Sequence, residues 1–457
     1  MKRIIYYILS SCLLLTTGCS NWLDVKPSNR VEQEEMFSTE DGFKNSLTGV
    51  YINLKSGSLY GQTLTMELNE YLAQHWKTNA SETPGYISAY DYENSSVQSM
   101  IDQVYTDFYN TIVNINNLLD FVDNGVLSED MYNLIKGEAL GLRAFCHLDL
   151  LRLYGPIPGK QTDKKILSYA GEVSRQNMPV NTWAEYVAFL EQDLNEAEAL
   201  LEKVEKKGIE NDYFTYRQNR MNYWAVMAVK ARFYLWIQNK EKAAEYAAKV
   251  IAGAGVQFKL SQPENFTNKD YIASSEHLFS IHVYNLEDIT EAFFYRAGGV
   301  DQTKSLIAKL FEGDVTDIRG DEKLWKQLKG SDFGNRYVLM KYKQSEALVT
   351  TREQIPLVRL YEMYLIAIEC SDEASVYQPL IKQLLTARNM SLDMDNAGVD
   401  QKNQFVAMEY HKEFYGEGQA FYQSKRRNDE TIMWSNTPGS ASVYVLPIPK
   451  GEIKYEE

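Results

Sequence analysis

The sequence predicts a mainly α-helical protein, a tetratricopeptide-like repeat scaffold (an α-α superhelix) with irregular loops and short strands inserted. Three observations indicate this class. Apolar residues recur at helical spacing from about Val97 onward. The helical segments come in pairs with short polar breaks between them. In one pair, small residues and a tyrosine have the spacing that lets two helices pack closely together.

The first residues have the layout of a secretory signal segment. Two basic residues precede an apolar run over 4–15 that is too short to span a bilayer. Residues 15–19, Leu-Thr-Thr-Gly-Cys, resemble the bacterial lipobox, in which the cysteine is acylated and becomes the first mature residue. We therefore predict a lipoprotein signal peptide over 1–18 and lipidation of Cys19. The alternative is an ordinary signal peptide with a chance cysteine.

Length alone would suggest two or three domains, but a helical repeat array can run this long as one body, and we predict that residues 19–457 form one domain. Its N-terminal part, 20–95, is expected to be rich in loops. Helical repeats are expected at about 97–255 and 354–415. Between them, over about 256–350, short alternating runs and glycines replace the helical period, which predicts a second loop-rich part.

The helices follow in order. Residues 98–122 and 129–154 form the first predicted pair. Residues 181–206 carry an apolar stripe, and Thr182 with Glu185 three residues later is a capping-box signal at the start of that helix.

The next pair, 221–238 and a helix ending at residue 251, contains the repeat-like spacing of Ala231, Tyr234, Ala243 and Ala247. One repeat cannot bury its own face, so neighbouring repeats are expected.

The last pair is predicted at 354–370 and 375–390, with a core stripe that includes Tyr361 and Tyr364.

Charge and cysteine content exclude several functions. The formal net charge is −15, and removal of residues 1–18 makes it more negative, which argues against binding to DNA or RNA and against a polybasic grip on anionic lipid. The four cysteines do not indicate a disulfide framework, since Cys146 and Cys370 lie inside apolar helical patterns. The unusual feature is an excess of tyrosine, with 32 residues, which suits both helical cores and sugar-stacking surfaces.

A run of motifs resembles one known family. The segment 139–158 reads A-L-G-L-R-A-F-C-H-L-D-L-L-R-L-Y-G-P-I-P. Further landmarks occur in order: W-L-D-V-K-P at 22–27, Asp193-Leu194, R-L-Y-E-M-Y-L at 359–365, E-F-Y-G-E-G at 413–418, and L-P-I-P at 446–449 with Glu452. Together they closely resemble the SusD/RagB family, the surface lipoproteins of nutrient-uptake systems in Bacteroidetes.

The resemblance implies a role and a partner. A SusD-like protein would be held by its lipid at the outer membrane, exposed on the cell surface, and would sit as a lid on a SusC-like TonB-dependent transporter. It would bind an oligosaccharide or polysaccharide and pass it to that transporter. The alternatives are a peptide-binding, RagB-like uptake lipoprotein and a repeat scaffold that binds no nutrient.

No catalytic motif was found. The five histidines lack metal-ligand spacing, and the sequence contains no His-Glu-x-x-His, Cys-x-x-Cys, Gly-x-Ser-x-Gly or phosphate-loop pattern. We therefore predict no enzyme activity, no catalytic or metal-ligating residue and no cofactor, with a structural calcium ion left open.

The predicted ligand-binding residues are aromatic side chains in the two loop-rich parts, where the family commonly places its ligand contacts. A flat ring covers the apolar face of a sugar, and a neighbouring amide hydrogen-bonds its hydroxyls. The alternative for each ring is packing in the core. The candidates are Trp76, Tyr86, Tyr90, Tyr92, Asn94, Tyr284, Phe294, Tyr295 and Trp325.

Overall fold

The computed structural model describes residues 28–174, 178–208, 215–320, 322–330 and 334–453. The predicted signal peptide and Cys19 lie outside the described residues.

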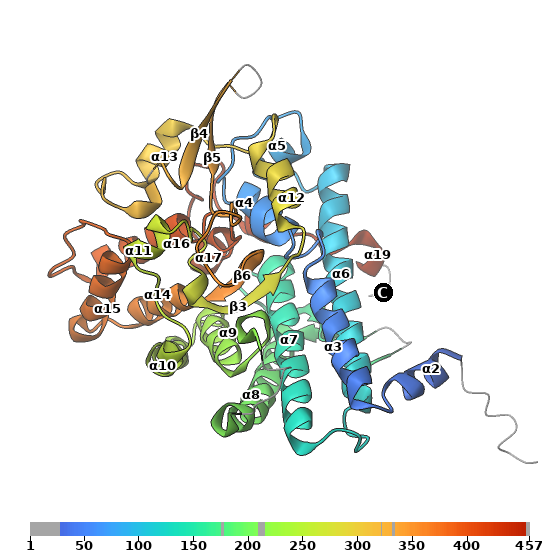
Figure 1. The fold of residues 1–457 in the computed structure, drawn as a ribbon. Coiled ribbons are helices and arrows are strands. Elements are labelled where there is room, and N and C mark those ends of the chain that lie inside the picture. The colour runs from blue at the N-terminus through green and yellow to red at the C-terminus, as the bar shows by residue number, and fades with distance from the viewer. Residues whose placement is uncertain (1–27, 175–177, 209–214, 321, 331–333, 454–457) are drawn as a thin grey trace, which may run out of the picture.

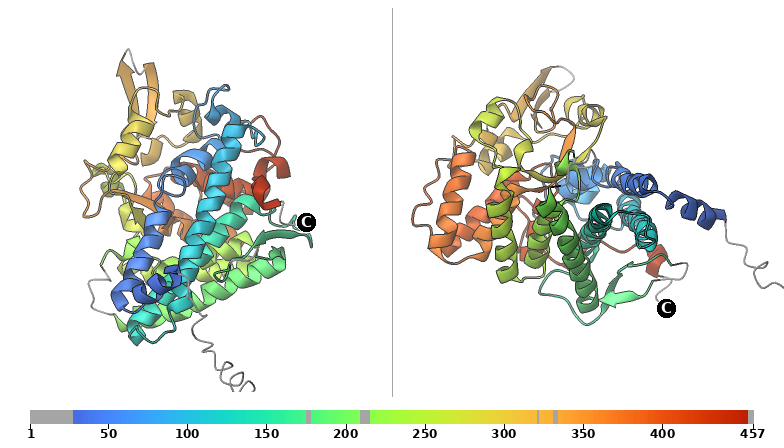
Figure 2. Two further views of the ribbon diagram at one scale, coloured as in Figure 1. Left: turned by 90° about the vertical axis from the view of Figure 1, so that its right-hand side faces the viewer. Right: turned by 60° about the horizontal axis from the view of Figure 1, so that its bottom comes forward.

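A row of long helices forms the body of the molecule, and each packs against the next (Figure 2). In order they are α6 (Ser95–Phe121), α7 (Glu129–Tyr154), α8 (Trp183–Lys207), α9 (Tyr223–Trp236), α10 (Lys240–Gly253), α14 (Leu360–Cys370) and α15 (Ala374–Ala387). The predicted class, a mainly α-helical repeat scaffold with loops and short strands inserted, is confirmed.

Helix α7, the second in this row, packs against α3, α6, α8 and α9. Almost all of its residues are buried, as its nearly continuous apolar sequence predicts, and its Asp149 and Arg152 pair at 2.8 Å. A Cβ added at Gly137 or Gly141 would lie 2.7 Å from a side-chain carbon of a neighbouring residue, Leu201 in the first case. These glycines therefore let α7 and its neighbours approach closely.

The local signals at the next helices are confirmed. Thr182 caps α8, and the Glu185 carboxylate accepts a 2.8 Å hydrogen bond from the Thr182 backbone N–H, which completes the capping box. In the α9–α10 pair, the two small residues Ala243 and Ala247 are fully buried against α9, and Tyr234 fills the space between the helices.

The N-terminal part is more helical than its sequence suggested. It contains α2 (Ser28–Met36), α3 (Glu40–Leu54), a π-helical turn η2 (Thr63–Glu67), α4 (Leu68–Leu72) and α5 (Thr83–Ser88). The prediction of a loop-rich segment is wrong for α3, in which Phe43, Leu47, Val50 and Leu54 recur at helical spacing and are buried. Helix α3 packs against α6 and α7 (Figure 1).

Short elements replace the long helices in the middle of the chain. The strands are β1 (Lys165–Ser168) with β2 (Val180–Thr182), β3 (His277–His282) with β6 (Gln354–Arg359), and β4 (Trp325–Gly330) with β5 (Gly334–Leu339), each pair antiparallel. The short helices are α11 (Pro263–Thr267), α12 (Leu286–Thr290), the π-helical turn η7 (Glu291–Tyr295) and α13 (Lys304–Leu310).

One predicted helix starts too early. We expected helix over 354–370, but residues 354–359 are the strand β6, and α14 begins at Leu360. The apolar run over 355–358 is short enough to suit either state, and pairing with β3, far away in sequence, decides for strand.

The C-terminal helices close the fold against α14 and α4. They are α16 (Val399–Glu413), α17 (Ala420–Arg427), α18 (Ala441–Tyr444) and α19 (Lys450–Ile453). The turn after α16 is fixed by Glu70 of α4, whose carboxylate accepts hydrogen bonds from the backbone N–H groups of Gly416 and Gly418 at 2.8 and 2.7 Å. Gly418 has a φ of 73°, and an added Cβ there would lie 2.0 Å from a backbone oxygen, so the position requires glycine.

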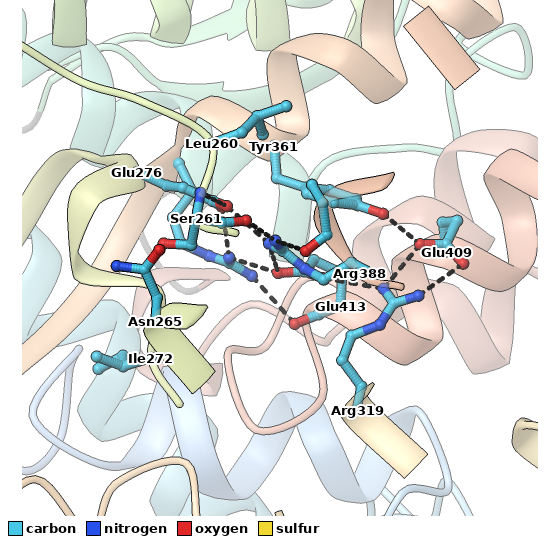
Figure 3. Close-up of polar contacts among 12 residues, drawn as sticks. Leu260, Ser261, Asn265, Ile272, Glu276, Arg319, Tyr361, Arg388, Glu409 and Glu413 are labelled. Carbon is cyan, nitrogen blue, oxygen red and sulfur yellow. Dashed lines mark hydrogen bonds and ion pairs between the residues drawn. The ribbon is translucent and has the colours of Figure 1, made fainter. Parts of the chain in front are cut away.

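A buried set of ion pairs joins these parts, and we call it the Glu413 network. The Glu413 carboxylate accepts hydrogen bonds from Arg359 at 2.6 Å, from Arg388 at 2.8 Å and from Arg319 at 2.9 Å. Figure 3 shows how the side chains converge. The network consists of Glu276, Asp317, Arg319, Lys341, Arg359, Arg388, Glu409, Lys412, Glu413 and Glu417.

The network makes the stability of the fold sensitive to acidic pH. Burial opposes ionisation of Glu413, but Arg388, Arg359 and Arg319 outweigh burial and hold the pKa of its carboxyl well below the ordinary value. A lowered pKa in the folded state means that this group stabilises the protein above the unfolded-state pKa of about 4.3. That stabilisation is lost as the pH falls through the folded-state pKa.

We predict that Glu413→Gln lowers the free energy of unfolding at neutral pH by about 3–5 kcal/mol, because it leaves buried guanidinium groups without their charge partner. Urea unfolding followed by circular dichroism measures the loss, and the gap to wild type should narrow as the pH falls below about 4. Glu245→Gln is the control, since Glu245 lies on the surface of α10 in an exposed pair with Lys249. Equal losses in the two variants would contradict the prediction.

Candidate functional site

Most of the aromatic residues predicted to bind ligand are in the core. Tyr284 is exposed, and Tyr86 and Asn94 are half-buried. The buried candidates are Trp76, Tyr90, Tyr92, Phe294, Tyr295 and Trp325. A ring without an exposed face cannot stack on a sugar, so the assignment of these six residues to a stacking surface is corrected by their burial.

Three of the buried candidates do come together, around Tyr415. The Tyr415 ring centroid lies 5.0 Å from that of Trp76 and 4.9 Å from that of Trp325, both edge-on. Phe294 contacts Trp76 at 5.5 Å, and the His75 ring stacks on Tyr415 at 4.0 Å. The two loop-rich parts therefore meet here, as a packed aromatic core and not as a platform.

The remaining buried candidates and Asn94 have structural partners. The hydroxyl of Tyr90 donates to the Leu72 carbonyl at 3.1 Å, and that of Tyr92 to the Val443 carbonyl at 2.6 Å. Tyr295 donates to the Leu339 carbonyl at 3.1 Å. Burial raises the pKa of each of these three phenols.

Asn94 is the N-cap of α6, because its side-chain oxygen accepts a hydrogen bond from the Ser96 N–H at 3.0 Å. Tyr86 packs against the hydrophobic core.

The exposed aromatic rings lie elsewhere. Among the described residues, the exposed aromatic side chains are Phe189 on α8, Tyr216 and Tyr284, with Tyr216 63% and Tyr284 72% exposed. Tyr216 lines two adjoining cavities of about 310 and 430 Å³, which also share Asn219 and His282. We call the combined surface the Tyr216 groove. Its main lining side chains are Tyr51, Ile52, Lys55, Tyr216, Asn219, Arg220, His282, Thr350, Thr351 and Arg352.

Four separate segments build the groove. Tyr51 and Ile52 lie on α3, and Tyr216 precedes the short 3₁₀ helix η4 (Arg217–Asn219). His282 is the last residue of β3, and residues 350–354 lead into β6. Figure 1 shows the end of β3 beside α3. Tyr284 follows two residues after β3, and the Lys55 ammonium lies 6.0 Å from its ring centroid.

The floor of the groove is held by side-chain hydrogen bonds. The Ser280 hydroxyl of β3 lies 3.0 Å from the Asn219 side-chain oxygen and 3.0 Å from the Gln354 side-chain oxygen. Asn222, the N-cap of α9, donates to the Leu278 carbonyl at 2.9 Å, which ties η4 and α9 to the strand. The polar groups of the groove are therefore presented by a fixed backbone.

One wall carries a buried carboxylate. Glu138 of α7 accepts hydrogen bonds from Tyr51 at 2.6 Å and from the Arg220 Nε at 2.9 Å. Burial and the adjacent Glu138 charge raise the pKa of Tyr51 well above its ordinary value. Tyr51 is thus a neutral hydrogen-bonding group, and Arg220 is already neutralised on one side.

Backbone strain marks the same surface. Tyr216 has a φ of 53° and Glu353 a φ of 58°, in the left-handed region that side chains other than glycine rarely adopt. Such residues cost about 1–3 kcal/mol each and cluster at binding sites.

Two further cavities are weaker candidates for a ligand-binding site. One, of about 340 Å³, lies between α6 and the β1–β2 hairpin and is lined by Tyr105 and Tyr109. The other, of about 520 Å³, lies between α5 and α6 and has mostly hydroxyl groups with Glu67. Neither of them is lined by an exposed aromatic ring.

The side chains in and around the groove suit binding of a ligand. Within the described residues, no group of three or more His, Cys, Asp or Glu side chains could hold a metal ion. Burial raises the pKa of Cys370 to about 12 and that of Cys146 further, so neither thiol is a nucleophile at neutral pH. Two open aromatic faces beside amide, hydroxyl and basic groups suit recognition of a polar ligand with flat apolar faces.

Known proteins are similar to this chain in sequence and in fold. A family model described as "Starch-binding associating with outer membrane" matches residues 21–235. SusD-like protein P25 of Formosa agariphila is 25% identical over 289 residues, which are 60% of this chain and 51% of that protein. SusD-like protein P2 of the same organism is 23% identical over 74% of this chain and 56% of its own length.

The chain is similar to SusD-like proteins in sequence and in fold. A crystal structure of a SusD superfamily protein from Bacteroides thetaiotaomicron matches with a TM-score of 0.71 and 20% identity, covering 91% of this chain and 98% of that one. One from Bacteroides vulgatus also gives a TM-score of 0.71, with 22% identity and coverage of 92% and 97%. The resemblance read from the sequence motifs is thereby confirmed.

Two further facts limit what the similarity to SusD-like proteins implies. The chain spans about half the length of the curated relatives it matches. Across the described residues, no helix combines the length and hydropathy that a membrane crossing needs.

We predict that Trp76→Ala destabilises this SusD-like protein by about 3–5 kcal/mol, because it opens a cavity in the aromatic core around Tyr415. Chemical unfolding measures the change. Tyr284→Ala should stay within about 0.5 kcal/mol of wild type, since its ring is mostly exposed. A Trp76→Ala protein as stable as wild type would show that the ring is not part of the core.

Proposed function

We propose that this SusD-like protein binds a glycan in the Tyr216 groove and delivers it to a SusC-like TonB-dependent transporter. The observation that carries the proposal is an exposed tyrosine ring, Tyr216, in a groove lined by hydrogen-bonding groups, with a second exposed ring, Tyr284, near the lining residue Lys55. The description of the matching family model, which names starch binding and the outer membrane, supports it.

The chemistry of the groove suits a sugar chain. The C–H face of a pyranose covers an aromatic ring, while its hydroxyls exchange hydrogen bonds with amide and hydroxyl groups at the edge. Asn219, Thr350 and Thr351 provide such groups beside Tyr216. Two adjoining cavities with a shared aromatic between them fit consecutive sugar units better than a single small molecule.

Delivery of the glycan would require a conformational change of the protein and no chemical reaction. The protein, held by a lipid on Cys19, captures the glycan while open and closes over the transporter barrel as a lid. No covalent step is needed, and the protein acts as a binding protein at the cell surface.

We predict that Tyr216→Ala and Tyr284→Ala each weaken glycan binding about tenfold or more, as expected for loss of an aromatic anchor. Retention in native gels that contain polysaccharides, followed by calorimetry with the retained glycan, measures the effect. Phe189→Ala removes the other exposed aromatic ring, on α8, and should bind as wild type does. Retention of peptide mixtures in place of glycans would favour the peptide-uptake alternative.

We predict that Cys19→Ala abolishes acylation and surface retention but leaves the glycan affinity of the soluble protein unchanged, because the anchor lies outside the binding body. Metabolic labelling with a fatty acid and protease accessibility on whole cells report the first two effects. Wild-type protein from gently solubilised membranes should co-purify with a large barrel protein. Isolation of wild-type protein alone would count against the transporter as partner.

A further inference from the structure

The charged residues that line the Tyr216 groove all have basic side chains. Lys55 and Arg220 line its first cavity, Arg352 its second, and His282 both. No acidic residue lines either cavity among the described residues. This lining differs from the chain as a whole, in which 62 acidic residues outnumber 47 basic ones.

Of the three lysine and arginine side chains, Arg220 is already matched by a carboxylate. It pairs with the buried Glu138 at 2.9 Å, which leaves little of its charge for a ligand. The His282 ring lies 3.3 Å from the Glu353 carboxylate.

Lys55 and Arg352 are the unmatched cations. Neither forms an ion pair with any residue that the structure describes. Lys55 lies just after α3, with its ammonium near the exposed ring of Tyr284. Arg352 is exposed and uses one Nη to donate to the Ala347 carbonyl at 3.0 Å, which fixes the guanidinium while its other N–H groups remain for a ligand.

The overall negative charge does not cancel these two cations. At physiological salt, exposed charges act over about 8–10 Å, so a ligand in the groove responds to Lys55 and Arg352 more than to distant carboxylates. Among the described residues, the carboxylates in contact with lining side chains are Glu138, paired with Arg220, and Glu353, 3.3 Å from His282. Lys55, Arg220 and Arg352 thus outnumber these two carboxylates, which makes the local charge of the described groove positive.

We propose that the glycan taken by this groove is anionic, a polysaccharide that carries uronate carboxylates or sulfate esters; this inference rests on the proposed glycan-binding function. Tyr216 and Tyr284 would stack on sugar rings, while the acidic groups of the chain contact Lys55 near one end and Arg352 in the second cavity. The planar fork of a guanidinium matches the paired oxygens of a carboxylate or sulfate, and the lysine ammonium acts as a point charge.

The experiment begins with an array of neutral, uronate-bearing and sulfated glycans from plant, algal and animal sources, probed with wild-type protein. We expect retention of anionic members and not of their neutral counterparts. Matched pairs of glycans test whether binding requires the acidic groups. Polygalacturonate is compared with its methyl ester for uronates, and dextran sulfate is compared with dextran for sulfates. Binding should weaken as salt concentration rises.

Charge-removing variants locate the effect. Lys55→Gln and Arg352→Gln should each weaken binding of the anionic glycan about two- to fivefold at low salt, and the double variant should lose much of the salt dependence. Lys382→Gln removes a charge from the surface of α15, away from α3 and the groove, and should bind as wild type does. An unchanged affinity in the double variant would overturn the inference.

Other outcomes distinguish a failure of the anionic-ligand inference from a failure of the proposed glycan-binding function. Retention of neutral glycans only, lost in Tyr216→Ala, would keep the glycan-binding function and reject the anionic ligand. Retention of no glycan on the array would reject the function itself. Competition by single-stranded DNA as effective as that by anionic glycan would show a general polyanion surface and also reject the proposal.

Discussion

The fold depends on one buried carboxylate, that of Glu413, and the three guanidinium groups around it. Each of these charges alone would cost several kcal/mol in the core, so none is tolerable there without the others. They come from η8 (Ile318–Gly320), the end of β6, the end of α15 and the end of α16. The network contains five basic and five acidic side chains, so its charge is balanced. This requirement binds the middle insertion to the helical row. It also gives a physical reason for two family landmarks, the arginine of R-L-Y-E and both glutamates of E-F-Y-G-E-G.

The same network sets the position of the groove. In the β3–β6 ribbon, His277 pairs with Arg359 at one end and His282 pairs with Gln354 at the other. Arg359 belongs to the network, and Glu276, which it contacts at 3.0 Å, directly precedes β3. One end of the ribbon is therefore held by buried ion pairs. The other end presents His282 and Tyr284 to solvent beside α3, which places the binding surface on a rigid support.

Much of the fold could be predicted from the sequence because its helices are periodic and carry their own caps. The capping box at Thr182 and the buried alanines of α10 are local signals, and they hold. The strand at 354–359 could not be distinguished from helix, since its partner lies about seventy residues earlier and only tertiary pairing selects the state. The prediction that the aromatic residues form a ligand-binding surface failed for a related reason. A tyrosine suits a core and a sugar surface equally, and Tyr90 and Tyr92 are buried only because distant carbonyls accept their hydroxyls.

The groove itself has no sequence signature, because its residues come from α3, η4, β3 and the approach to β6. Net charge is an incomplete constraint on its ligand. A value of −15 describes the average of the surface, whereas a ligand experiences the charges within a Debye length of it. Burial removes Arg319, Arg359 and Arg388 from the surface together with the carboxylates that balance them. Pairing with Glu138 then neutralises Arg220. Among the described residues, the groove keeps two unpaired cations, Lys55 and Arg352, near the exposed rings of Tyr216 and Tyr284. It is thus a small positive site on an acidic protein, and it can be recognised only once the fold shows which charges are paired.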